Sequence, residues 1–152
     1  MKKRIYLVVA AFCWVLASAA QNTDIYDSVL AKKTGADDYG MKQYVMAFLK
    51  KGPAQVTDKN QRSELLKGHM QNIGKLAEVG KLVLAGPMTA DTGIEGIYVF
   101  NVTTIAEAEA LSLTDPAVKA GLFAMEYHPW YATAALMEIV RMHNTLQKKK
   151  RM

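Results

Sequence analysis

The stretch KQYVMAFLK, residues 42–50, decides the fold of this chain. Its six consecutive apolar residues have the length of a strand, and Gly52-Pro53 ends the run. An antiparallel strand with one solvated face carries polar residues at every second position, and this one does not. We therefore expect both faces of its sheet to be covered, and a second copy of the sheet is the economical cover for the open face. The strand predicts a homodimer.

Two helices are expected beyond this strand. Residues 60–79 place apolar side chains along one stripe, and Gly80 stands where helices favour a stop. Thr104 and Glu107 have the spacing of a capping box, which begins a second helix that runs to about residue 113.

Three further strands complete the pattern, at residues 82–85, 96–101 and 122–128. Pro129 has no N–H for an interior ladder, so the last of them is expected at a sheet edge or to end there. The order strand, helix, strand, strand, helix, strand predicts an α+β fold of the ferredoxin-like type, β-α-β-β-α-β. Its four-stranded antiparallel sheet carries both helices on one face, and a C-terminal helical extension follows.

The first twenty residues have the pattern of a secretory signal peptide. A basic start at residues 2–4 precedes an apolar stretch over residues 5–16, and small residues favour cleavage near Ala19 or Ala20. An uncleaved anchor is the alternative, but the apolar stretch is shorter than the roughly 20 residues that span a bilayer comfortably. We expect a periplasmic or secreted bacterial protein with no membrane span after cleavage. Its mature form would lack cysteine, because Cys13 is the only one.

The basic character of the chain lies at its two ends. The net charge of +5 includes three basic residues at 2–4 and four at 148–151, and removing these seven leaves −2. A nucleic-acid partner is not expected, since that role needs a basic surface on the folded domain. About 130 residues remain after the signal, enough for one domain. We divide the mature chain into a linker or arm at 21–41, an α+β domain at 42–131, and a C-terminal helix with a basic tail at 132–152.

Three distant segments carry candidate site residues. His69 lies at the edge of the apolar stripe of the first helix, Asp115 follows the second helix, and His128 and Trp130 close the last strand. An imidazole and a carboxylate in a dry cleft are the minimum for proton transfer. Pro87 ends a strand where a backbone amide is available to a developing oxyanion.

Each candidate also has a structural interpretation. His69 is equally a buried hydrogen-bonding residue, Asp115 a cap for the short segment 117–121, and His128 an edge-strand residue beside an aromatic ring. The spacing of His69, Asp115 and His128 is not that of metal ligands, and we predict neither a metal nor another cofactor.

The segment from residue 44 to residue 131 resembles the YCII-related, or YciI-like, domain. The resemblance rests on Lys51-Gly52-Pro53, on a helical His69 ahead of the run at 80–87, on the run at 114–121, and on the sequence HPWY at 128–131. It implies a fold of the dimeric α+β barrel superfamily and a catalytic pair that corresponds here to His69 and Asp115. One related class has dehydrochlorinase activity on chlorinated hydroxyquinols, while most members have no assigned substrate.

These observations give two functional hypotheses. The first is an exported general acid–base enzyme of the isomerase or lyase type, in which His69 and Asp115 act on a small organic molecule. The alternative is a non-catalytic module of the cell envelope that binds a small molecule or dimerises.

Overall fold

The computed structural model describes residues 25–149. The predicted signal peptide, Cys13 and the last residues of the basic tail lie outside this range. Four strands form one antiparallel sheet in the order β2-β3-β1-β4. Their bounds are β1 (Met41–Lys51), β2 (Leu82–Pro87), β3 (Gly96–Phe100) and β4 (Phe123–Thr133).

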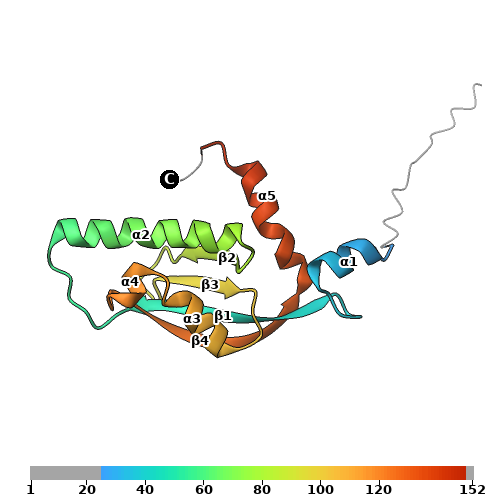
Figure 1. Cartoon of the computed structure of the whole chain (residues 1–152), viewed down its shortest axis with the longest axis horizontal. Helices are drawn as coiled ribbons and strands as arrows, with labels where there is room; N and C mark the ends of the chain where they lie inside the picture. Colours follow the sequence, from blue (N-terminus) through green and yellow to red (C-terminus); the bar gives the residue numbers. More distant parts are fainter. Residues whose placement is uncertain (1–24, 150–152) are drawn as a thin grey trace, which may run out of the picture.

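The two helices predicted between the strands lie where the sequence places them. The long helix α2 (Lys59–Glu78) follows β1, and α3 (Ile105–Ser112) with the short α4 (Pro116–Lys119) connects β3 to β4 (Figure 1). Thr104 and Glu107 form the predicted capping box: the Glu107 N–H donates to Thr104 Oγ1 at 3.2 Å, and Glu107 Oε2 accepts from the Thr104 N–H at 3.1 Å. The expected ferredoxin-like α+β fold is confirmed.

The strand register separates the two faces of the sheet. Paired residues on neighbouring antiparallel strands point to the same side, and β1 pairs with β4 over its whole length, from Met41↔Thr133 to Lys51↔Phe123. Val45 and Ala47 point toward the helices, where they form a core with Leu76 of α2 and Ala108 of α3.

The opposite face is partly covered by the chain itself. Beyond β4 lie a 3₁₀ helix, η1 (Ala134–Glu138), and α5 (Ile139–Leu146). Leu136 and Met137 of η1 pack against a second cluster of buried residues on the sheet, which consists of Tyr44, Val83, Val99 and Ala132. The chain itself therefore covers the end of this face nearest η1, and the predicted second copy is needed only for the rest of the face.

An N-terminal helix, α1 (Ser28–Thr34), lies against η1 and falls within the segment predicted as a linker or arm (Figure 1). Lys33 of α1 and Glu138 of η1 form an ion pair at 2.7 Å. None of the helices formed by residues 25–149 is long and apolar enough to cross a membrane.

The strand β4 continues through Pro129 to Thr133, five residues beyond its expected end. It lies at the edge of the sheet, as the proline predicts. Only one side of an edge strand is paired, so a proline without an N–H fits there.

Candidate active site

His69 belongs to the buried stripe of α2. Its buried neighbours on the helix are Asn72 and Leu76, which stand three and seven residues further on and so share one face. His69 is 8% exposed, so it lies deeper than the stripe edge predicted from the sequence. The imidazole of His69 therefore lies between the helices and the sheet.

A close helix contact brings Asp115 to this imidazole. Gly68, next to His69, faces the ring of Pro116 at the start of α4, and a Cβ atom on Gly68 would lie 2.5 Å from Pro116 Cγ. Glycine at this position lets α2 and α4 approach more closely than any other residue would allow. Asp115 precedes Pro116 and is 1% exposed.

The structure pairs His69 with Asp115. His69 Nδ1 lies 2.6 Å from Asp115 Oδ2, and Asp115 Oδ1 accepts the Ala117 N–H at 2.8 Å. Asp115 is therefore both the partner that the family resemblance implies and the helix cap of the structural interpretation. A carboxylate oxygen accepts a hydrogen bond from an imidazole N–H, so Nδ1 is the donor of this pair. The tautomer with its hydrogen on Nδ1 has its lone pair on Nε2.

Two aromatic residues of the sheet surround the imidazole. The hydroxyl oxygen of Tyr98 lies 3.4 Å from His69 Nε2, and the ring centroid of Phe123 lies 5.0 Å from that of His69. Burial, and secondarily the charge of Asp115, raise the pKa of Tyr98 well above its ordinary value. Tyr98 therefore stays a neutral phenol at physiological pH and faces Nε2 as a hydrogen-bond donor.

Asn72 forms a second contact between α2 and the segment that carries Asp115. Its Nδ2 donates to Thr114 Oγ1 at 2.8 Å, which ties α2 to the residue before Asp115. The buried Asn72 Oδ1 has no hydrogen-bond partner among the described residues. Asn72 and Gly68 together fix the position of α2 relative to the start of α4.

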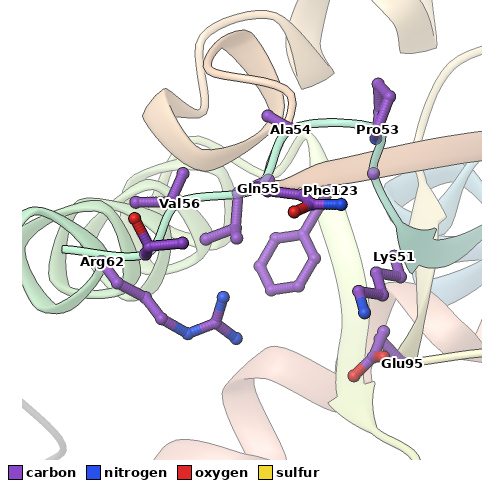
Figure 2. A pocket seen from close by; sticks show the side chains of 11 residues that line it. Lys51, Pro53, Ala54, Gln55, Val56, Arg62, Glu95 and Phe123 are labelled. Atoms are coloured by element: carbon purple, nitrogen blue, oxygen red, sulfur yellow. The ribbon is translucent and has the colours of Figure 1, made fainter. Parts of the chain in front are cut away.

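A cavity of about 570 Å³ opens beside this pair, between the end of β1, the loop at residues 52–57, the first turns of α2 and the start of β4. Figure 2 shows Lys51, Arg62 and Glu95 around the ring of Phe123. Neither His69 nor Asp115 lines this cavity, but Phe123 lines it and packs against His69. Phe123 is therefore the shared wall between the cavity and the imidazole.

The other predicted site residues lie elsewhere. His128 pairs with Met46 and Trp130 with Tyr44, so both point to the sheet face opposite His69. The expectation that His128 converges with His69 is therefore wrong, because the register puts a whole sheet between them. His128 Nε2 instead bonds Glu126 Oε1 at 2.8 Å.

Trp130 packs against Tyr44, with ring centroids 6.4 Å apart, and Pro87 is exposed at the end of β2. Neither residue lines the cavity beside the pair. A pocket role for Trp130 and Pro87 thus stays a prediction, without a contact to His69 that supports it.

Sequence reasoning missed three residues of the site: Asn72, Tyr98 and Phe123. Two signals were available for them. Asn72 stands one helical turn after His69, and Tyr98 occupies an inward position of the strand predicted at 96–101. Phe123 carried no such signal, because its face depends on the register of β4 against β1. Among residues 25–149, no group of three His, Cys, Asp or Glu side chains is arranged to hold a metal ion.

The chain is similar to 5-chloro-2-hydroxyhydroquinone dehydrochlorinase from Burkholderia phenoliruptrix AC1100, solved in complex with 2,5-dihydroxybenzoquinone, at 21% sequence identity and a TM-score of 0.41. The match covers 59% of this chain and 93% of that one. The search of curated proteins found no match. The sequence model of the YCII-related domain matches residues 43–131, more than half of the chain, and the chain therefore belongs to the YCII-related domain family.

Proposed function

We propose that this protein is a general acid–base enzyme of the isomerase or lyase type, which moves a proton on a small organic molecule. The observation that carries the proposal is the buried 2.6 Å contact between His69 Nδ1 and Asp115 Oδ2. A carboxylate held in this way fixes the imidazole tautomer and stabilises the imidazolium that forms when Nε2 takes a proton.

The surroundings of Nε2 favour this chemistry. Its only hydrogen-bond partner among the described residues is the Tyr98 hydroxyl at 3.4 Å, which is long for a hydrogen bond to nitrogen. A substrate proton can compete with so weak a partner. The neutral Tyr98 phenol can then donate to an oxygen atom of the substrate on which negative charge develops.

The test is a screen for proton abstraction in D₂O. Small organic molecules with an acidic C–H next to a carbonyl or hydroxyl group are incubated with the protein, and NMR follows the exchange of that hydrogen for deuterium. The wild type is expected to catalyse exchange or elimination for at least one chemical class, and His69→Gln is expected to abolish it. His143→Gln is the matched control, because His143 is exposed on α5. Equal rates for wild type and His69→Gln would refute the proposal.

A non-catalytic binding module is the second candidate. It is favoured by one observation, that His69 does not line the 570 Å³ cavity and is separated from it by Phe123. In that case the cavity binds its ligand with the same affinity in the wild type and in His69→Gln, and no ligand turns over.

We further propose that the protein is exported and forms a homodimer. Export is supported by the signal-like pattern of residues 1–20. The dimer is supported by the sheet face opposite the helices, where the half-buried Phe48 and Ile97 lie away from the cover that η1 provides. N-terminal sequencing of the protein from its envelope fraction, and light scattering at micromolar concentration, test the two proposals. An intact N-terminus or a monomeric mass would contradict them.

A further inference from the structure

The cavity beside the catalytic pair has a wall that the backbone fixes. Gly52 N–H donates to Leu122 O and Ala54 N–H donates to Gly121 O, both at 2.9 Å. A Cβ atom on Gly52 would lie 2.1 Å from Gly121 O, so these two segments touch backbone to backbone. The loop at 52–57 is thereby tied to the start of β4, and the cavity between them is formed before a ligand arrives.

The cavity is lined by an aromatic ring and by three charged side chains, which we call its rim. The ring of Phe123 faces the cavity, and the side chains of Lys51, Arg62 and Glu95 surround it (Figure 2). The volume of about 570 Å³ falls within the range of small-molecule sites. Two positive charges and one negative charge give this rim a net positive character.

The three rim charges form no ion pair within the part of the chain that the structure describes. Within residues 25–149, neither Lys51, Arg62 nor Glu95 forms an ion pair. Three other cations form ion pairs within this range, Lys33 and Arg141 with Glu138 and Lys50 with Glu126, and the remaining lysines do not. Lys51 and Arg62 are therefore available to an anion in the cavity, and the planar guanidinium of Arg62 matches the two oxygens of a carboxylate.

We propose that this cavity binds a small organic monoanion, with its carboxylate between Arg62 and Lys51 and its apolar body against Phe123. Glu95, on the same rim, repels a second negative charge and so selects a monoanion over a dianion. The binding of the anion stands by itself. That this anion is also the substrate rests on the proposed function of His69, which lies directly behind the Phe123 ring.

The test is an NMR titration of the protein purified from cells that express the full sequence. Benzoate is the probe, benzamide is its uncharged counterpart, and acetate lacks the apolar body. Benzoate is expected to shift the backbone amide signals of Gly52, of residues 54–57 and of Phe123 saturably. Benzamide and acetate are each expected to bind roughly tenfold more weakly, because each loses one of the two interactions.

Variants identify the residues responsible. Arg62→Gln and Lys51→Gln should each weaken benzoate binding by roughly tenfold, while Arg141→Gln, on α5, should leave it unchanged. Glu95→Gln should let the dianion terephthalate approach the affinity of benzoate. Equal binding of benzoate and benzamide, shifts outside the cavity, or no effect of both Arg62→Gln and Lys51→Gln would overturn the proposal.

One further variant separates this inference from the proposed function. His69→Gln removes the proposed base but leaves every residue of the rim in place. Benzoate that binds to His69→Gln as it binds to the wild type supports the anion site even if no turnover is found. Turnover of uncharged molecules only, with no benzoate binding, would overturn the anion site and leave the acid–base proposal standing.

Discussion

The contact between Gly68 and Pro116 gives the most demanding prediction, because α2 carries its own control. Gly68 and Gly74 both lie inside α2, so alanine gains the same helix propensity at each, about 1 kcal/mol. Their surroundings differ. A Cβ atom on Gly74 meets nothing within 4 Å, whereas one on Gly68 lies 2.5 Å from Pro116 Cγ.

The magnitudes follow from this difference. Gly74→Ala is expected to raise the free energy of unfolding by about 1 kcal/mol, which for a domain of this size raises Tm by roughly 4 °C. In Gly68→Ala the same gain opposes an overpacking cost of about 1–3 kcal/mol. The cost cannot be relieved by a side-chain rotation, since the proline ring is joined to the backbone at the start of α4. The unfolding free energies of the two variants should therefore differ by about 1–3 kcal/mol.

Urea unfolding of the wild type and both variants measures this difference. The NMR signal of the His69 Nδ1 proton reports in addition on the pair: it should move or broaden in Gly68→Ala, where α4 is pushed from α2, and stay in place in Gly74→Ala. If both variants are stabilised equally and the signal is unchanged in both, the close approach of α2 and α4 does not position Asp115 and our account of the site is wrong.

Three further perturbations test the site and the contacts that support it. Asp115→Asn should lower turnover by roughly three to four orders of magnitude, because an amide that donates to Nδ1 of His69 moves the imidazole proton to Nε2. ¹⁵N NMR of the imidazole should show the exchanged tautomer, and an unchanged tautomer would contradict the assignment. Phe123→Ala should speed the modification of His69 by diethyl pyrocarbonate, since the ring that separates the imidazole from the cavity is gone. Peptide mapping by mass spectrometry measures the rate of modification. An unaltered rate would mean that this ring does not shield His69. Hydrogen bonds, first from Lys33, hold the pKa of Glu138 below its ordinary value of 4.5. The contribution of the Lys33–Glu138 ion pair to the contact of α1 with η1 is therefore complete above pH 4.5 and is lost as the pH falls through the lowered pKa. Hydrogen exchange in α1 should rise over that range, and protection that persists at lower pH would show that the ion pair does not hold the helix.

Local signals in the sequence were sufficient for the presence of the four strands and of α2 and α3. Thr104 and Glu107 form their capping box within four residues, so nothing distant changes the outcome. The stripe of α2 and the proline at the edge strand are likewise properties of single elements. The pairing of His69 with Asp115 was predicted mostly through the family resemblance, since 46 residues separate the two and their contact depends on how α2 packs against α4.

The misplacement of His128 has a different physical cause. A strand with period two shows which residues share a face, and His128 does share one with Trp130. It does not show which face the helices cover, because β1 is apolar on both sides and gives no polar face as a guide. For the same reason the packing of Leu136 and Met137 on the other face of the sheet was not predicted. These two residues lie beyond residue 131, where the predicted α+β domain ends.

The two nitrogens of His69 are the strongest argument that the buried pair serves chemistry as well as stability. A buried polar atom without a good partner costs about 1–3 kcal/mol, so a histidine with a purely structural role is expected to have both nitrogens well bonded. Here Nδ1 meets a carboxylate at 2.6 Å, while Nε2 meets only the Tyr98 hydroxyl at 3.4 Å. The strong contact fixes the tautomer with its lone pair on Nε2, and the weak one leaves that lone pair available. The imidazole does not line the cavity, because the ring of Phe123 lies between the two. A substrate bound in this cavity reaches Nε2 only if the ring moves, which makes the position of Phe123 the feature that separates an enzyme that uses this cavity from a binding module.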